Sequence, residues 1–430
     1  MRGPSLLNKV LRAASFASVP AEVLLRAETI APELLGALSR KSPRPLTRLA
    51  VELGERLPLP PTVEPFEAGQ FVRLPRHQRC FYLLAEPRPV GTQRPRRAAA
   101  AVLAIKGAEP WIPEFDRWVE ELRFTYLDLT HTNQRRLAEH FALVEHKLPG
   151  ALSRDEAERE FWAAVTVQRA HLARYGELGQ FPVPLYVLAA PPAVATQVRS
   201  ALSTHLSAKA FERIQPLLDR GLAVYVYAYP NLPWRVAHYA DRLRGTRFSE
   251  RLAAMEHHLR PEVVVQGWIQ QLVRLMSLGF VPAAPWARGA GVCCDPNNAV
   301  IDGGFVDLDS VAPLAAFASP TALDEGLNLT FVNLCATLRT FLLGERREPS
   351  KDRDLPEYWI EGFAAEQLAE GLAREAQQGF APDARIATFF QRCPEFSTLT
   401  ARLDAYYTRR IAPRETPPAS APRGPRRRAT

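Results

Sequence analysis

The order of strand-like and helix-like segments is the feature that most constrains how this chain can fold. Short apolar or aromatic runs come first, one long segment with helical spacing interrupts them, and the second half is mainly helical. Strands are expected over residues 71–74, 80–84, 98–105, 183–189 and 221–229. This order predicts an α+β protein in which a small antiparallel sheet precedes a group of helices.

Helix signals are clearest after the first three strands. Ser153-Arg-Asp-Glu156 is a capping box, in which the two side chains satisfy the first backbone N–H groups. The helix that it opens is expected to reach Tyr175, with apolar positions at Phe161, Trp162, Val165 and Leu172. Near the N-terminus, helical spacing predicts a helix from Ala21 to Leu38. Later helices are expected over residues 246–259, 261–278, 324–343, 356–378, 382–392 and 397–411.

Proline-rich junctions and changes of composition divide the 430 residues into four parts. An N-terminal helical extension covers residues 1–60, and residues 61–230 hold the sheet with inserted helices. Residues 231–412 form a helical part with a hairpin over residues 291–311. The tail, residues 413–430, is rich in proline and arginine and is expected to be disordered.

Charge and cysteine content narrow the setting of the protein. The net charge is +8, part of it in the tail, where no nucleic-acid-binding signature accompanies the arginines. Five widely spaced cysteines give neither a disulfide framework nor a metal pattern, which favours a reducing, cytoplasmic setting. No segment approaches the ~18 uninterrupted apolar residues of a membrane span, so no transmembrane segment is expected.

The stretch from Gly289 to Val311 carries most of the chemical information. Asp302-Gly303-Gly304 predicts a tight turn between two apolar strands, the second of which ends at Asp307. The hairpin would bring Asn298 and Asp307, nine positions apart, to the same end. Amide and carboxylate oxygens are ligands for Mg²⁺, and Asp309 is a candidate second acid. The alternative is a surface hairpin whose Asn and Asp residues only form turns.

A lysine at the end of the third strand is the second candidate. Ala104-Ile105-Lys106 resembles the strand that places a lysine on ATP phosphates, and such a lysine needs an acidic partner. The capped helix offers Glu158 and Glu160, which cannot both face the sheet because they are two positions apart. Glu160 is the expected partner of Lys106. The alternative is a lysine that is solvated at a strand end.

Together these residues resemble the selenoprotein O-like family of atypical kinases, over roughly residues 70–345. The matching pieces are Lys106-Gly-Ala, Arg159-Glu-Phe161, Gly279-Phe280, Gly291-Val292, Asn298, Ile301-Asp-Gly, Phe305 and Asp307. The resemblance implies a two-lobed, protein-kinase-like fold, with an N-terminal helical extension and a mainly helical C-lobe, that binds ATP and Mg²⁺. Enzymes of that family transfer AMP to protein hydroxyls. Lys106 would then contact phosphates, Glu160 would hold Lys106, and Asn298 and Asp307 would bind metal.

The sequence departs from this pattern at the base and at the phosphate loop. Where an ordinary kinase has its catalytic Asp, this chain has Cys293. The family that it resembles has an Asp directly before the metal Asn, and this chain has Asn297 there. Asp295 is the one carboxylate in that loop, and it can act as a base only if Pro296 turns it toward the phosphates; the alternative is a turn-forming Asp-Pro pair. The expected phosphate loop holds one glycine, and the arginines that can replace it as phosphate clamps are Arg94, Arg96 and Arg97.

Two functions therefore stay open. The first is an ATP- and Mg²⁺-dependent transferase that moves AMP or phosphate to a hydroxyl of a protein substrate or a small molecule. The second is a catalytically inactive pseudokinase, a nucleotide-binding or regulatory module, which the base departures favour. A small-molecule kinase would carry a His-x-Asp before Asn298, and this chain has none.

Overall fold

The computed structural model describes residues 17–41, 56–59, 70–72, 80–84, 102–107, 132–229, 233, 235–237, 261–287, 292–342 and 358–391. The helices expected over residues 246–259 and 397–411 lie outside these residues. The same is true of the candidate phosphate clamps Arg94, Arg96 and Arg97 and of the basic tail.

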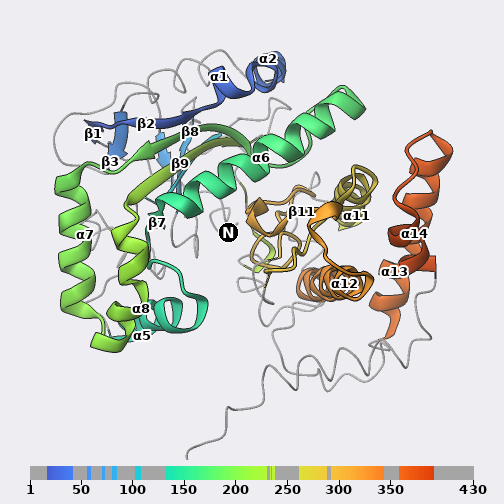
Figure 1. The fold of residues 1–430 in the computed structure, drawn as a ribbon. Helices are drawn as coiled ribbons and strands as arrows, with labels where there is room; N and C mark the ends of the chain where they lie inside the picture. The colour runs from blue at the N-terminus through green and yellow to red at the C-terminus, as the bar shows by residue number, and fades with distance from the viewer. Residues whose placement is uncertain are drawn as a thin grey trace, which may run out of the picture.

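An antiparallel sheet forms the first half of the described structure (Figure 1). Its strands are β2 (Val23–Arg26), β4 (Gln70–Val72), β5 (Cys80–Leu84), β6 (Val102–Lys106), β8 (Val183–Ala189) and β9 (Leu222–Tyr229). They lie in the order β2-β8-β9-β6-β5-β4, and the short β7 (Leu152–Ser153) also pairs with β9. Two small sheets join β1 (Ala17–Pro20) to β3 (Arg56–Leu59) and β10 (Phe280–Val281) to β11 (Ala312–Pro313). The mixed helix and sheet content confirms an α+β protein.

The central strands β6 and β9 are buried along their whole length. Runs of β-branched, aromatic and small apolar residues suit a strand that is covered on both faces. Every strand of this sheet that the sequence predicts is present, and residues 98–101 of the third predicted strand lie outside the described residues. The end of β6 at Lys106 places that side chain beside Cys80 of β5 and Tyr225 of β9.

Helix α6 (Arg154–Tyr175) packs on β8 and β9 and continues toward the later helices (Figure 1). The N-cap predicted at its start is confirmed, because the Ser153 side chain accepts a hydrogen bond from the Glu156 amide at 3.3 Å. The helix ends at Gly176, whose positive φ of 71° closes the last turn. Among the expected apolar positions of this helix, the prediction for Trp162 is wrong, because this residue is 44% exposed and does not lie in the core.

The helix predicted from Ala21 to Leu38 is interrupted in the structure. Its first part pairs with β8 as strand β2, and two helices follow, α1 (Ala27–Ile30) and α2 (Pro32–Lys41). Pro32 lacks an N–H group and disfavours helical backbone at the preceding residue, so Ala31 leaves the helix with φ −144°. The apolar run over residues 23–25 suits a strand as well as a helix, and the exposed edge of β8 decides between them.

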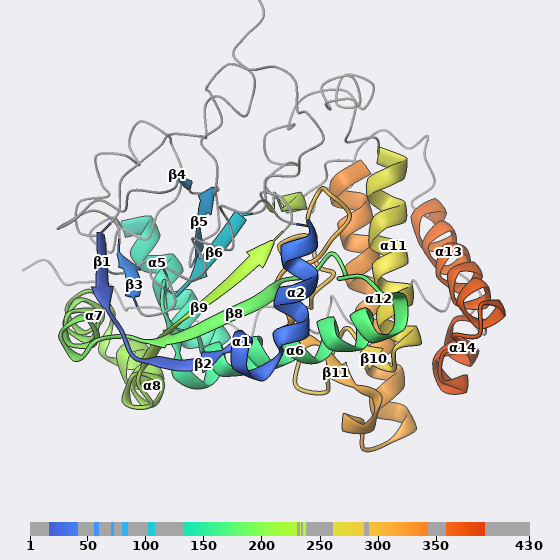
Figure 2. The ribbon, with the colours of Figure 1, turned by 90° about the horizontal axis from the view of Figure 1, so that it is seen from above.

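The later helices gather beside the sheet, as Figure 2 shows from above. They are α11 (Pro261–Ser277), α12 (Pro320–Leu342), α13 (Tyr358–Gln377) and α14 (Ala384–Gln391), and they confirm four predicted helices. Three helices that were not predicted precede them: α5 (Thr132–His140), α7 (Pro192–His205) and α8 (Ala208–Asp219). Among the described helices, none is both long and apolar enough to cross a membrane.

The predicted hairpin between α11 and α12 is present in reduced form. Within it, Ala299 and Phe305 make a single bridge, and Val300 accepts the Gly303 amide at 3.0 Å. Asp302-Gly303-Gly304 forms the turn, with Gly303 at φ 91°. The prediction of a regular second strand that ends at Asp307 is wrong. Asp307 takes the left-handed conformation at φ 68°, and a short 3₁₀ turn follows over Leu308–Ser310.

Two close approaches hold this turn in place. A Cβ atom on Gly267 of α11 would lie 2.7 Å from the Cα atom of Gly303, so only glycine allows this contact. On the other side, the Phe305 amide donates to the Gln180 carbonyl at 3.1 Å, and a Cβ atom on Gly304 would meet the same carbonyl at 2.6 Å. The turn is therefore clamped between α11 and the segment that enters β8.

Candidate functional site

Lys106, at the end of β6, forms the centre of the candidate site. Its ammonium is almost fully buried and lies 2.7 Å from each carboxylate oxygen of Glu160. The same Nζ atom donates to Oδ1 of Asp307 at 2.9 Å. The predicted pairing of Lys106 with Glu160 is confirmed, and Asp307 joins it. A buried ammonium is stable only with such partners, because burial without them costs several kcal/mol.

The choice between the two glutamates of α6 is also settled by geometry. Glu160 faces the sheet and is 2% exposed, whereas Glu158 pairs with Arg154 at 2.7 Å on the solvent side. Positions two apart on a helix lie on nearly opposite faces, so a helix that buries Glu160 against the sheet leaves Glu158 facing solvent.

Three acids meet around the lysine. One carboxylate oxygen from each of Glu160, Asp307 and Asp309 lies within 4.8 Å of the others, the one such group found among the described residues. Counting Lys106 as +1 and three ionised acids as −3 leaves a formal charge of −2. Hard carboxylate oxygens are the ligands that Mg²⁺ uses, and a divalent cation would balance this charge. The donor set therefore fits a magnesium ion.

The electrostatics of the acids reflect this excess of negative charge. The pKa of Glu160 is raised to about 8, chiefly by burial and also by Asp307 and Asp309, against the opposing effect of Lys106. The pKa of Asp309 is also raised, chiefly by burial and then by Asp307, while Lys147 and Lys106 lower it. Acids that are held near one another in a buried site resist ionisation unless a cation joins them.

Asn298 lies where the two arms of the predicted hairpin meet. Its backbone carbonyl accepts the Val306 amide at 2.9 Å, which confirms that the two arms of the hairpin meet there. Its buried side-chain amide donates to the Val292 carbonyl at 3.1 Å. In the described part of the chain, the acids that gather with Asp307 are Asp309 and Glu160, and the role of Asn298 as a metal ligand stays a prediction.

Asp295 serves the turn that Pro296 begins. Its Oδ1 atom accepts the amides of Asn297 at 2.6 Å and Asn298 at 3.1 Å, and the residue is buried. This is the local pattern by which Asp closes an Asx turn. One oxygen of this carboxylate holds the loop that carries Asn298, as the turn-forming alternative expects, and a role for Asp295 as a base stays a prediction.

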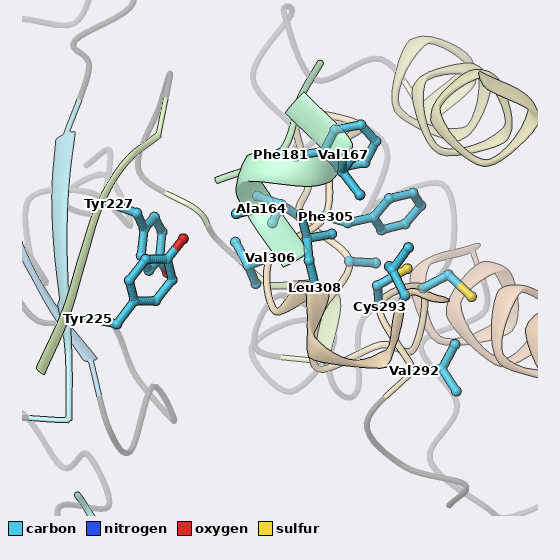
Figure 3. Close-up of a cluster of buried hydrophobic side chains, with 14 of the residues drawn as sticks. Ala164, Val167, Phe181, Tyr225, Tyr227, Val292, Cys293, Phe305, Val306 and Leu308 are labelled. Atoms are coloured by element: carbon cyan, nitrogen blue, oxygen red, sulfur yellow. The ribbon is translucent and has the colours of Figure 1, made fainter. Parts of the chain in front are cut away.

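A small hollow of about 10 Å³, room for about one water molecule, adjoins the lysine, Glu160 and Asp307. Tyr225 and Tyr227 of β9 form one wall and Leu308 the facing one, and Figure 3 shows both tyrosines directed from the strand toward Val306 and Leu308. Arg235 also lines it. In the sequence, the alternation of tyrosines indicates one face of a strand. No local pattern indicates Arg235, whose backbone pairs with Val300 and so places the residue beside the hollow.

Comparisons of the chain with protein-family models, with curated proteins and with solved structures find no match. The functional argument therefore depends on the side chains of this site and on their chemistry.

Proposed function

We propose that this chain is an ATP- and Mg²⁺-dependent transferase of kinase-like fold that moves AMP or phosphate to a hydroxyl of a protein or a small molecule. The observation that supports it is the buried ammonium of Lys106, held by Glu160 at 2.7 Å and by Asp307 at 2.9 Å. In the kinase arrangement a strand lysine meets a helix glutamate and a metal-binding aspartate in this way.

In this proposal each residue has a role that its position allows. Asp307 and Asp309 hold the metal, and Glu160 orients Lys106 so that its ammonium faces the phosphate oxygens. When bound there, Mg²⁺ would supply positive charge to the phosphate oxygens on which negative charge develops during transfer. The acceptor hydroxyl oxygen forms a bond to phosphorus while the bond to pyrophosphate or ADP breaks, and the hydroxyl proton is released to water. Positioning and charge stabilisation supply most of the acceleration in such transfers.

Mass spectrometry of the intact protein after incubation with Mg-ATP and a generic acceptor protein tests this function. A mass increase of one phosphate or of one AMP, on either protein, is the expected result, and it also identifies the transferred group. Lys106→Met, treated in the same way, is the control in which the increase is lost. Binding of Mg-ATP without any transfer would contradict the transferase.

That second outcome corresponds to a pseudokinase, which one observation favours. The carboxylate of Asp295 is occupied by the amides of Asn297 and Asn298, in the loop where a kinase carries its base. A nucleotide-binding module without turnover needs the metal and phosphate contacts but no base. Calorimetry with Mg-ATP, together with the mass measurement, separates the two functions.

A further inference from the structure

The hydroxyl of Tyr225 is a buried donor that lacks a hydrogen-bond partner among the described residues. The residue is 2% exposed, and it lines the hollow beside Lys106, its neighbour across strands β6 and β9. Burial and the nearby acids Glu160 and Asp307 raise the pKa of Tyr225 well above its usual value, so the hydroxyl keeps its proton. A buried hydroxyl without a partner is costly, which indicates that a ligand or water supplies an acceptor.

A second donor reaches the same hollow from another part of the chain. Arg235 lines it, and its Nε atom is buried without an acceptor among the described residues. A backbone bridge to Val300 places Arg235 beside the hairpin that carries Asp307. Guanidinium groups bind phosphate oxygens well because several N–H groups point in fixed directions.

The hollow therefore presents donors and acids together. The ammonium of Lys106, the hydroxyl of Tyr225 and the guanidinium of Arg235 suit anionic oxygens, whereas the acids around Asp307 suit a divalent cation. A polyphosphate that carries its own metal ion satisfies both. We propose that Tyr225 and Arg235 donate hydrogen bonds to the phosphate oxygens of the bound Mg-nucleotide. This inference rests on the proposed function and adds to it the residues that hold the phosphates.

The strand provides a matched control. Tyr227 lies two positions along β9 and lines the same hollow, but its hydroxyl already contacts the Cys80 sulfur at 4.0 Å. The experiment compares Tyr225→Phe, Arg235→Gln and Tyr227→Phe with the wild type by calorimetry. Mg-ATP, Mg-tripolyphosphate and adenosine are the three probes.

We expect Tyr225→Phe to weaken Mg-ATP and Mg-tripolyphosphate about 10-fold and Arg235→Gln about 10- to 100-fold, the usual effect of a hydrogen bond to a charged group. Adenosine should bind both variants as it binds the wild type. Tyr227→Phe should leave the affinities for all three probes unchanged. A structural role for the hydroxyl predicts that Tyr225→Phe destabilises the protein. The inference predicts the reverse, a melting temperature about 1–3 °C higher, because an unpaired buried group is removed.

The possible results separate this inference from the proposed function. Unchanged phosphate affinities in both variants, with Mg-ATP bound by the wild type, overturn the inference alone. Weaker adenosine binding with unchanged tripolyphosphate binding also overturns it, since the two residues would then contact the nucleoside. If the wild type binds Mg-tripolyphosphate but not Mg-ATP, the proposed function fails, and the variants still decide the inference on tripolyphosphate. A wild type that binds neither phosphate probe overturns both.

Discussion

The Nζ atom of Lys106 lies 2.9 Å from Oδ1 of Asp307, a residue 201 positions further along the chain. The same ammonium contacts both oxygens of Glu160, so one buried cation serves two acids while Asp309 lies within reach of both. A single positive charge does not neutralise three carboxylates, so the three acids resist full ionisation unless a proton or another cation joins them.

Removing the charge of Asp307 should weaken metal-dependent nucleotide binding. Asp307→Asn is the appropriate change, because asparagine tolerates the left-handed backbone at this position, where φ is 68°. We expect the affinity for Mg-ATP, measured by calorimetry, to fall at least about 10-fold, because a charged ligand to the metal is lost. Asp383→Asn is the control, since Asp383 pairs with Arg385 on the surface. An unchanged affinity in Asp307→Asn would make Asp307 a turn residue only.

Lys106→Met should lower stability in a way that metal restores. With the ammonium gone, three acids remain around an apolar side chain, and loss of one partner from a buried charge cluster costs about 3–5 kcal/mol. Added Mg²⁺ should raise the melting temperature of this variant more than that of the wild type. Arg154→Met removes an exposed pair with Glu158 and should cost no more than about 0.5 kcal/mol. Equal Mg²⁺ effects in wild type and Lys106→Met would argue against a metal at the acids.

The stability of the metal-free protein should fall as pH rises. The pKa of Glu160 is raised from 4.5 to about 8 in the folded state, so the folded protein binds its proton more tightly than the unfolded chain does. The stabilisation is complete below about pH 4.5 and is lost as pH rises to about 8. Urea denaturation of wild type and Glu160→Gln at about pH 5, 7 and 9 checks this, because the difference between them isolates Glu160. Stabilisation by Mg²⁺ should increase over the same range, and a pH-independent difference would contradict the shift.

Asp295 should behave as a turn residue. Asp295→Ala removes the acceptor for two amides and should lower the unfolding free energy by about 1–2 kcal/mol, whereas Asp295→Asn keeps an acceptor and should cost less. If the chain transfers a group from ATP, Asp295→Asn should retain turnover. Loss of turnover with unchanged Mg-ATP binding would instead identify Asp295 as the base.

Gly267→Ala should destabilise the protein because its Cβ atom would lie 2.7 Å from the Cα atom of Gly303. Overpacking of this kind usually costs about 1–3 kcal/mol, measured here by thermal unfolding. Gly36→Ala in α2 has open space around it and should stabilise the protein by about 0.5–1 kcal/mol. A neutral Gly267→Ala would mean that α11 shifts readily away from the turn.

Local signals account for the elements that were predicted correctly. The buried strands β6 and β9 and the capped helix α6 carry strong apolar runs and a cap, and these bring Lys106 and Glu160 together in the structure. Residues 23–25 fit two kinds of element, and only the edge of β8 selects the strand. Arg235 reaches the hollow through its pairing with Val300, and Glu160 joins Asp307 and Asp309 in the acid cluster. Both placements depend on contacts between distant segments, which spacing along the chain does not encode.

The glycine contacts around the hairpin turn have a mechanical consequence. Gly303 rests on α11, and Phe305 is bonded to Gln180 beside the sheet, so the turn is anchored on both sides. The Tyr175–Glu375 and Arg274–Glu177 pairs also join the sheet part to the later helices. Asp307 lies two residues beyond Phe305, so this anchorage fixes where its carboxylate meets Lys106. A change in the packing of α11 against the turn would therefore be transmitted to the acid.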